Sequence, residues 1–253
     1  MSKAFGEILK KWRKLRRYSQ LQLASEVGVS CRHISFLETG RSSPSQATIL
    51  KLGRFLHMPR REINRALAVS DFAPIYRETL EADADLAPIN FAIEKMLKDH
   101  MPYPAFVLNK EWDLVKANES ALILLKYINF TESNNLIESL LQDDPATSKI
   151  LNWGETVSVL LDRLRYEIDM LGGSRRMEDM ERALRRHLCA NGMEKDFDHK
   201  QVVLNTKFQV EGDVLSFFSV VSQLGAVMDV TVSEFTVELM FPADETTKNH
   251  YAI

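Results

Sequence analysis

The order of helix-start and helix-stop residues near the N-terminus is the feature that most constrains the fold. Ser19 and Gln22 have the spacing of a capping box, in which each side chain satisfies a backbone amide at a helix start. Gly28 then supplies the left-handed residue at which a helix commonly ends. Ser30 can cap a second helix, which Gly40 ends in the same way. The pattern therefore predicts two short helices joined by a tight turn.

The flanking sequence predicts three more helices. Apolar residues at helical spacing mark a helix over residues 3–16, with basic side chains on its opposite face. Its apolar positions are Phe5, Ile8, Leu9, Trp12 and Leu15. Downstream, Pro44 and Ser45 open a fourth helix and Pro59 starts a fifth, because proline fits the first turn of a helix. We therefore expect an all-α five-helix domain over residues 1–68.

Charge is divided unequally between the two parts of the chain. Residues 1–65 contain five Lys and nine Arg against four acidic residues, a net charge of +10. Residues 66–253 contain 18 basic and 31 acidic residues, a net charge of −13. This asymmetry is expected of a nucleic-acid-binding domain joined to a separate acidic module. The alternative is a basic N-terminal region that is merely solvated.

Length and cysteine usage limit the class of protein. A chain of 253 residues suits two domains, each large enough for a core of its own. Cys31 and Cys189 are far apart and form no disulfide framework or metal-ligand spacing, which indicates a reducing compartment. The N-terminus does not resemble a secretory signal, and no segment approaches the roughly 18–20 apolar residues of a membrane span. We expect a soluble, cytoplasmic protein with no membrane association.

The second part of the chain reads as an α+β domain with an antiparallel sheet. Prolines and aspartates interrupt the helical pattern, so we expect a linker at 69–87 and a second domain at 88–253. Alternating apolar residues and polar turns predict the strands. The expected strands are 104–109, 114–117, 201–210, 214–222 and 234–241, and the expected helices are 88–100, one from Asn118, 147–171 and 176–190.

Two short helices joined by a tight turn in basic surroundings are typical of a helix-turn-helix, whose second helix lies in the major groove. Its outward candidates for reading bases are Cys31, Arg32, Ser35 and Phe36. Arg32 can bind guanine through two hydrogen bonds, and Phe36 can contact a thymine methyl group. The other candidate DNA contacts, at the ends of these helices and in the loop after them, are Gln20, Ser30, Thr39, Arg41 and Ser43. The alternatives are that Phe36 packs in the domain and that Arg41 is a solvated loop charge.

The same residues carry a resemblance to a known family. Ser19-Gln20 through Leu23-Ala24, Gly28-Val29-Ser30, Ile34, Leu37-Glu38 and Gly40-Arg41 together resemble the phage-repressor-like XRE-type helix-turn-helix. The resemblance implies that Arg13 and Glu38 form a partly buried pair that orients the helices. The runs Arg32 to Ser45, Pro59 to Asn64 and Phe72 to Tyr76 are similar to the MmyB-like subgroup of transcription regulators.

The resemblance continues into the second domain. Pro104 to Asn109 and Val115 to Ala121 are similar to the opening strands and first helix of a PAS-like sensor domain. Asn152-Trp153 and Leu164-Arg165 resemble the subgroup's effector domain in order and spacing, whereas residues 192–213 depart from it. The subgroup implies a small-molecule effector, with fatty-acyl compounds as the best precedent.

A curved sheet with one covered face commonly encloses an apolar cavity. The sheet residues expected to face it are Phe106, Leu108, Leu204, Phe208, Val237 and Leu239. The 147–171 helix would cover it with the apolar stripe that includes Trp153, Leu161 and Leu164. Arg165, beside that stripe, is the candidate to receive a ligand carboxylate. The alternatives are that these residues form solid core and that Arg165 is a surface charge near Asp162 and Asp169.

Other functional classes have less support. The six histidines are scattered without metal-ligand spacing, and there is no glycine-rich phosphate loop or nucleophile elbow, so we expect no enzyme, metal or cofactor. A protein-binding helix-turn-helix and a cofactor-holding PAS domain are rival hypotheses. Our prediction is a homodimeric regulator that binds double-stranded DNA at a pseudo-palindromic operator under control of a fatty-acyl effector. The alternative is a second domain that only dimerises or binds a protein partner.

Overall fold

The protein is described by a computed structural model that covers residues 2–79, 86–127, 130, 133–193, 204–224 and 229–252. The chain divides into two compact units, the first built chiefly on Met1–Glu78 and the second chiefly on the chain from Thr79 onward. Within the described ranges, no helix is both long enough and apolar enough to cross a bilayer.

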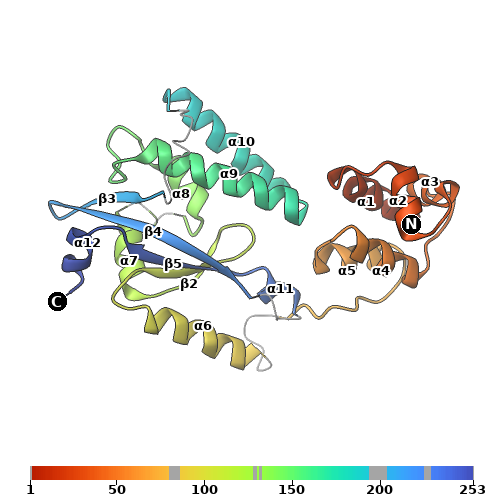
Figure 1. The fold of residues 1–253 in the computed structure, drawn as a ribbon, viewed down its shortest axis with the longest axis horizontal. Coiled ribbons are helices and arrows are strands. Elements are labelled where there is room, and N and C mark those ends of the chain that lie inside the picture. Colours follow the sequence, from red (N-terminus) through yellow and green to blue (C-terminus); the bar gives the residue numbers. More distant parts are fainter. Residues whose placement is uncertain are drawn as a thin grey trace. The chain divides into compact units, whose positions relative to one another are not determined.

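The first unit is helical, as the sequence predicts. Its helices are α1 (Ser2–Leu15), α2 (Gln20–Val27), α3 (Cys31–Thr39), α4 (Gln46–Phe55) and α5 (Arg60–Ala68) (Figure 1). Their apolar faces meet in one core, in which Trp12, Leu23, Ile34, Leu37 and Leu67 are fully buried. Burial of these side chains provides most of the free energy that holds such short helices in place.

The predicted capping residues form the expected hydrogen bonds. The Ser19 hydroxyl accepts from the Gln22 amide, and the Gln22 side chain accepts from the Ser19 amide. Gly28 ends α2 at φ 65°, a left-handed conformation that glycine adopts without steric cost. Ser30 then caps α3 through the backbone amide of His33. These local bonds fix the turn between α2 and α3.

The second unit is an α+β domain. Its helices are α6 (Ala87–Asp99), α7 (Glu119–Lys126), α8 (Leu136–Gln142), α9 (Trp153–Leu171), α10 (Arg175–Ala190), α11 (Val230–Ser233) and α12 (Glu245–His250). Its strands are β1 (Ala105–Leu108), β2 (Leu114–Ala117), β3 (Thr206–Val210), β4 (Asp213–Gln223) and β5 (Thr236–Pro242). The strands form one antiparallel sheet in the order β2-β1-β5-β4-β3, which confirms the predicted fold class.

The two faces of this sheet are covered differently. Figure 1 shows α6 on one side of the sheet and α9 and α10 on the other. Against α6, Ala105, Val107 and Val237 pack on Ile93 and Leu97 in a solid core. The opposite face is only partly filled by side chains, and it forms the wall of a cavity described below.

Element boundaries differ from the sequence prediction in a few places. The helix expected at 147–171 begins at Trp153, because the segment before it pairs with the edge strand β3. In that pairing the Leu151 amide donates to the Lys207 carbonyl, and the Gln209 amide donates to the Lys149 carbonyl. The sequence reading also missed the short helices α8, α11 and α12. Residues 201–203 of the expected third strand lie outside the described residues.

One glycine in the first unit permits a close helix crossing. At Gly6 of α1, a Cβ atom would lie 2.6 Å from the carbonyl oxygen of Leu37 and would also collide with that of Glu38. Both oxygens belong to α3, so only glycine lets these two helices approach so closely.

We predict that Gly6→Ala destabilises the protein by about 1–3 kcal/mol, as expected for overpacking against backbone. In an unobstructed helix the same change would stabilise by about 1 kcal/mol, so the sign of the effect is the test. Thermal unfolding measures it, with Glu7→Ala at the adjacent exposed position as the matched control. An increase in Tm for Gly6→Ala would contradict the close crossing.

Candidate DNA-reading helix and ligand cavity

Helix α3 has one buried face and one face open to solvent. Ile34 and Leu37 are fully buried and hold the helix on the core of the first unit. Arg32 is exposed, and Ser35 and Phe36 are half-buried on the outer side. Cys31, expected to point outward, is instead partly buried against the core. The outer face that could enter a DNA groove therefore contains three of the four residues predicted from the sequence.

An aromatic ring lies between two arginines on this outer face. The guanidinium carbon of Arg32 is 5.0 Å from the centroid of the Phe36 ring, and that of Arg41 is 5.9 Å from it. Both distances fall within the range of cation–π attraction. Phe36 thus limits where the two positive charges lie, in addition to its predicted contact with a base.

The other candidate DNA contacts have different surroundings. The Thr39 hydroxyl donates to the Ser35 carbonyl at 2.8 Å, and the Ser30 hydroxyl is occupied as a helix cap. Arg41 and Ser43 are exposed in the loop after α3. The Gln20 amide, expected to face a phosphate, donates to the Glu38 carboxylate at 2.7 Å.

The implied pair of Arg13 and Glu38 is present and buried. Arg13 Nε lies 2.5 Å from Glu38 Oε1, and Arg13 Nη2 lies 2.9 Å from Oε2. Burial by itself would raise the pKa of Glu38, but hydrogen bonds from Arg13 and Gln20 outweigh it, so this pKa lies below its ordinary value. The ionised Glu38 carboxylate therefore stabilises the folded state at neutral pH, and this stabilisation is lost as the pH falls through the lowered pKa.

We predict that Arg13→Met costs about 3–5 kcal/mol, because it leaves the Glu38 charge buried without its partner. The double variant Arg13→Met/Glu38→Leu should recover much of that loss, since it removes both charges. Urea unfolding at neutral pH measures both changes. If the single and double variants lose the same free energy of unfolding, the cost of Arg13→Met does not come from the unpaired Glu38 charge.

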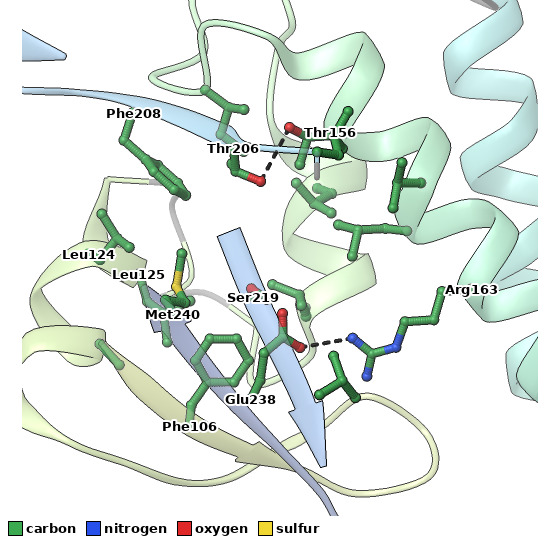
Figure 2. Close-up of a pocket in the computed structure, with 18 residues that line it drawn as sticks. Phe106, Leu124, Leu125, Thr156, Arg163, Thr206, Phe208, Ser219, Glu238 and Met240 are labelled. Carbon is green, nitrogen blue, oxygen red and sulfur yellow. Dashed lines mark hydrogen bonds and ion pairs between the residues drawn. The ribbon is translucent and has the colours of Figure 1, made fainter. Parts of the chain in front are cut away.

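The second unit contains a cavity of about 290 Å³, near the lower end of the range for small-molecule sites (Figure 2). Its wall comes from the sheet and from α7, α8 and α9. The apolar lining residues are Phe106, Ala121, Leu124, Leu125, Leu136, Leu140, Ile150, Val159, Leu160, Leu204, Phe208, Val221 and Met240. Such a wall favours an apolar occupant.

A few polar side chains interrupt the apolar wall. Arg163 of α9 forms an ion pair with Glu238 of β5, with Nη1 and Oε2 2.9 Å apart (Figure 2). At another point of the wall, the hydroxyl oxygens of Thr156 and Thr206 are 3.5 Å apart. Ser219 completes the polar lining. The cavity can therefore orient a molecule that has both an apolar body and a polar end.

Three of the six predicted sheet residues line the cavity, namely Phe106, Leu204 and Phe208. Val237 and Leu239 do not, because they lie on the opposite face with the core beneath α6. The antiparallel register places Glu238, rather than either neighbour, beside Phe106. Leu108 shares the face of Phe106 and is buried, but it is not part of the cavity lining.

On α9 the cavity is lined by Thr156, Val159, Leu160 and Arg163, and of these Leu160 belongs to the predicted apolar stripe. Trp153, Leu161 and Leu164 are buried but lie outside the lining. The Trp153 ring packs edge-on against His187 of α10, with centroids 5.2 Å apart. Helix α9 therefore has a second buried side, toward α10, that the apolar stripe did not distinguish from the cavity side.

The arginine at the cavity is Arg163 and not Arg165. Arg165 Nε is bound at 2.8 Å to Glu181 of α10, and its Nη1 lies 3.3 Å from Asp162. The hydrogen bond with Glu181 raises the pKa of Arg165 above its ordinary value. The sequence prediction missed both members of the cavity pair, although Glu238 was visible as an acidic residue between Val237 and Leu239 in the expected last strand.

Comparison with known families covers both units. Residues 89–252 match the MmyB-like transcription regulator ligand binding domain, and residues 9–63 match a helix-turn-helix family. No curated protein matches the chain. The first match contains the sheet and the cavity, and the second contains α2 and α3.

Proposed function

This chain belongs to the MmyB-like transcription regulators, and from that premise we propose that it acts as a homodimer on a pseudo-palindromic operator. The helix-turn-helix makes it a DNA-binding regulator. In our proposal, each α3 enters a major groove, and the two half-sites lie about one helical turn apart. A small apolar effector of the fatty-acyl class occupies the cavity and alters operator affinity. The observation that carries the sensor role is an apolar cavity with an ion pair in its wall.

For DNA readout, Arg32 is the residue best placed to bind a base edge. It is exposed near the N-terminal end of α3, where recognition helices contact bases. Ser35 and Phe36 would contact neighbouring bases, while Ser30, Thr39, Arg41 and Ser43 would bind the backbone. Gln20 would also bind the DNA backbone, because its side-chain amide has a second N–H that can donate while the first remains bound to Glu38.

We predict that Arg32→Ala costs about 1–3 kcal/mol in specific binding and relaxes preference at one base position. Arg41→Ala is the matched control, since it should weaken binding to all sequences and reduce the salt slope by about one unit. Selection from random duplexes followed by titration at several salt concentrations measures both. Loss of base preference in Arg41→Ala, with none in Arg32→Ala, would reverse the two assignments.

For the effector, we predict that affinity rises with acyl chain length by about 0.8 kcal/mol per methylene until the cavity is full. Calorimetry with a series of linear acids and alcohols measures this dependence. Leu160→Trp should weaken all of them, because Leu160 lines the cavity. The control is Leu151→Trp, an exposed position outside the lining. Absence of heat with every chain length would leave a second domain that only dimerises or binds a protein.

A further inference from the structure

The described lining of the cavity contains one positive and one negative side chain. Within the described lining, Arg163 and Glu238 are the ionisable residues, and they face one another across 2.9 Å. Their side chains are 18% and 8% exposed, so little water screens the pair. The rest of the polar lining consists of hydroxyl groups, which carry no charge.

The strands beside Glu238 add no charge to its surroundings. Its cross-strand neighbours are Phe106 of β1 and Val221 of β4, both apolar. On the helix side, the Arg163 guanidinium also lies over the Trp112 ring, with its carbon 4.6 Å from the ring centroid. The pair is therefore held between apolar and aromatic groups.

Other charged residues on the surrounding elements lie outside the described lining. Lys110, after β1, pairs with Glu234, and Glu138 of α8 pairs with Arg176 of α10. Lys207 of β3 and Lys126 of α7 are exposed and outside the lining. Asp213, at the start of β4, lies 3.7 Å from His250. Among the described residues, Glu238 and Arg163 are therefore the charged groups that line the cavity.

A ligand carboxylate would disturb this balance. Its natural partner is the Arg163 guanidinium, which already binds Glu238. Two carboxylates would then share one guanidinium in poorly hydrated surroundings, with one negative charge left uncompensated. Carboxyl groups that share a site relieve such repulsion by holding a proton between them.

We propose that the cavity selects acyl ligands in a net-neutral form, and that a carboxylic acid enters with uptake of one proton from solvent. The ligand carboxyl and Glu238 then share that proton in an O–H···O hydrogen bond beside Arg163. Primary amides and alcohols of the same chain length bind without proton exchange, since they add no charge. This inference rests on the proposed sensor function and specifies its ligand class.

Isothermal calorimetry of the full-length protein with decanoic acid and decanamide tests the proposal. Titrations in phosphate and in Tris at the same pH separate the heat of binding from the heat of buffer ionisation. The acid should take up about one proton per molecule bound and the amide none. The acid's affinity should fall about tenfold for each unit rise in pH above neutrality, while that of the amide stays constant.

Glu238→Gln provides the matched variant, because it keeps the shape of the side chain and leaves Arg163 without this carboxylate partner. The acid should then bind as its anion with no proton uptake and with pH-independent affinity. Retained binding of decanamide shows that the variant cavity is intact. Glu94→Gln, at an exposed position of α6 on the opposite side of the sheet, should behave as the wild-type protein does.

The outcomes separate this inference from the function on which it rests. Binding of both compounds to the wild-type protein, with no proton uptake for the acid, would overturn the inference and leave the sensor function standing. Binding of neither compound would remove the sensor function and the inference with it. Proton uptake that persists unchanged in Glu238→Gln would exclude Glu238 as the group that shares the proton.

Discussion

Strand β5 lies between β1 and β4, and the register of its two pairings decides which side chains enter the cavity. Glu238 pairs with Phe106 on one side and with Val221 on the other, so these three residues share one face. A shift of one residue would turn Val237 into the cavity and bury the Glu238 carboxylate in the apolar core beneath α6. The ion pair with Arg163, and with it the charge balance of the cavity, follows from this register.

The helix-turn-helix could be predicted closely from sequence because its signals are local. Ser19 and Ser30 cap helices through amides three residues away, and Gly28 adopts the left-handed conformation that ends α2. The partner of Gln20 could not be predicted in this way, since Glu38 lies 18 residues further along the chain. That contact depends on how α2, which begins at Gln20, packs against α3, which contains Glu38.

In the second unit the strands and most helices were predictable, but the faces that form the cavity were not. Successive side chains of a strand alternate between its two faces, and both faces of β5 are buried. Apolar residues therefore cannot show which face of β5 borders the cavity. The same difficulty arises on α9, which is buried toward α10 and toward the cavity. Arg163 and Arg165 are two positions apart and hence point to different sides of the helix, about 200° around its axis.

Under the proposed function, occupancy of the cavity changes the affinity for DNA. Titration of a selected operator duplex with the full-length protein, with and without saturating decanamide, measures this change. We expect operator affinity to change by about fivefold or more, and ligand affinity to change by the same factor when operator is present. The Leu160→Trp variant, whose cavity is filled, should show neither change. An unchanged operator affinity when the cavity is saturated would show that the cavity does not regulate DNA binding.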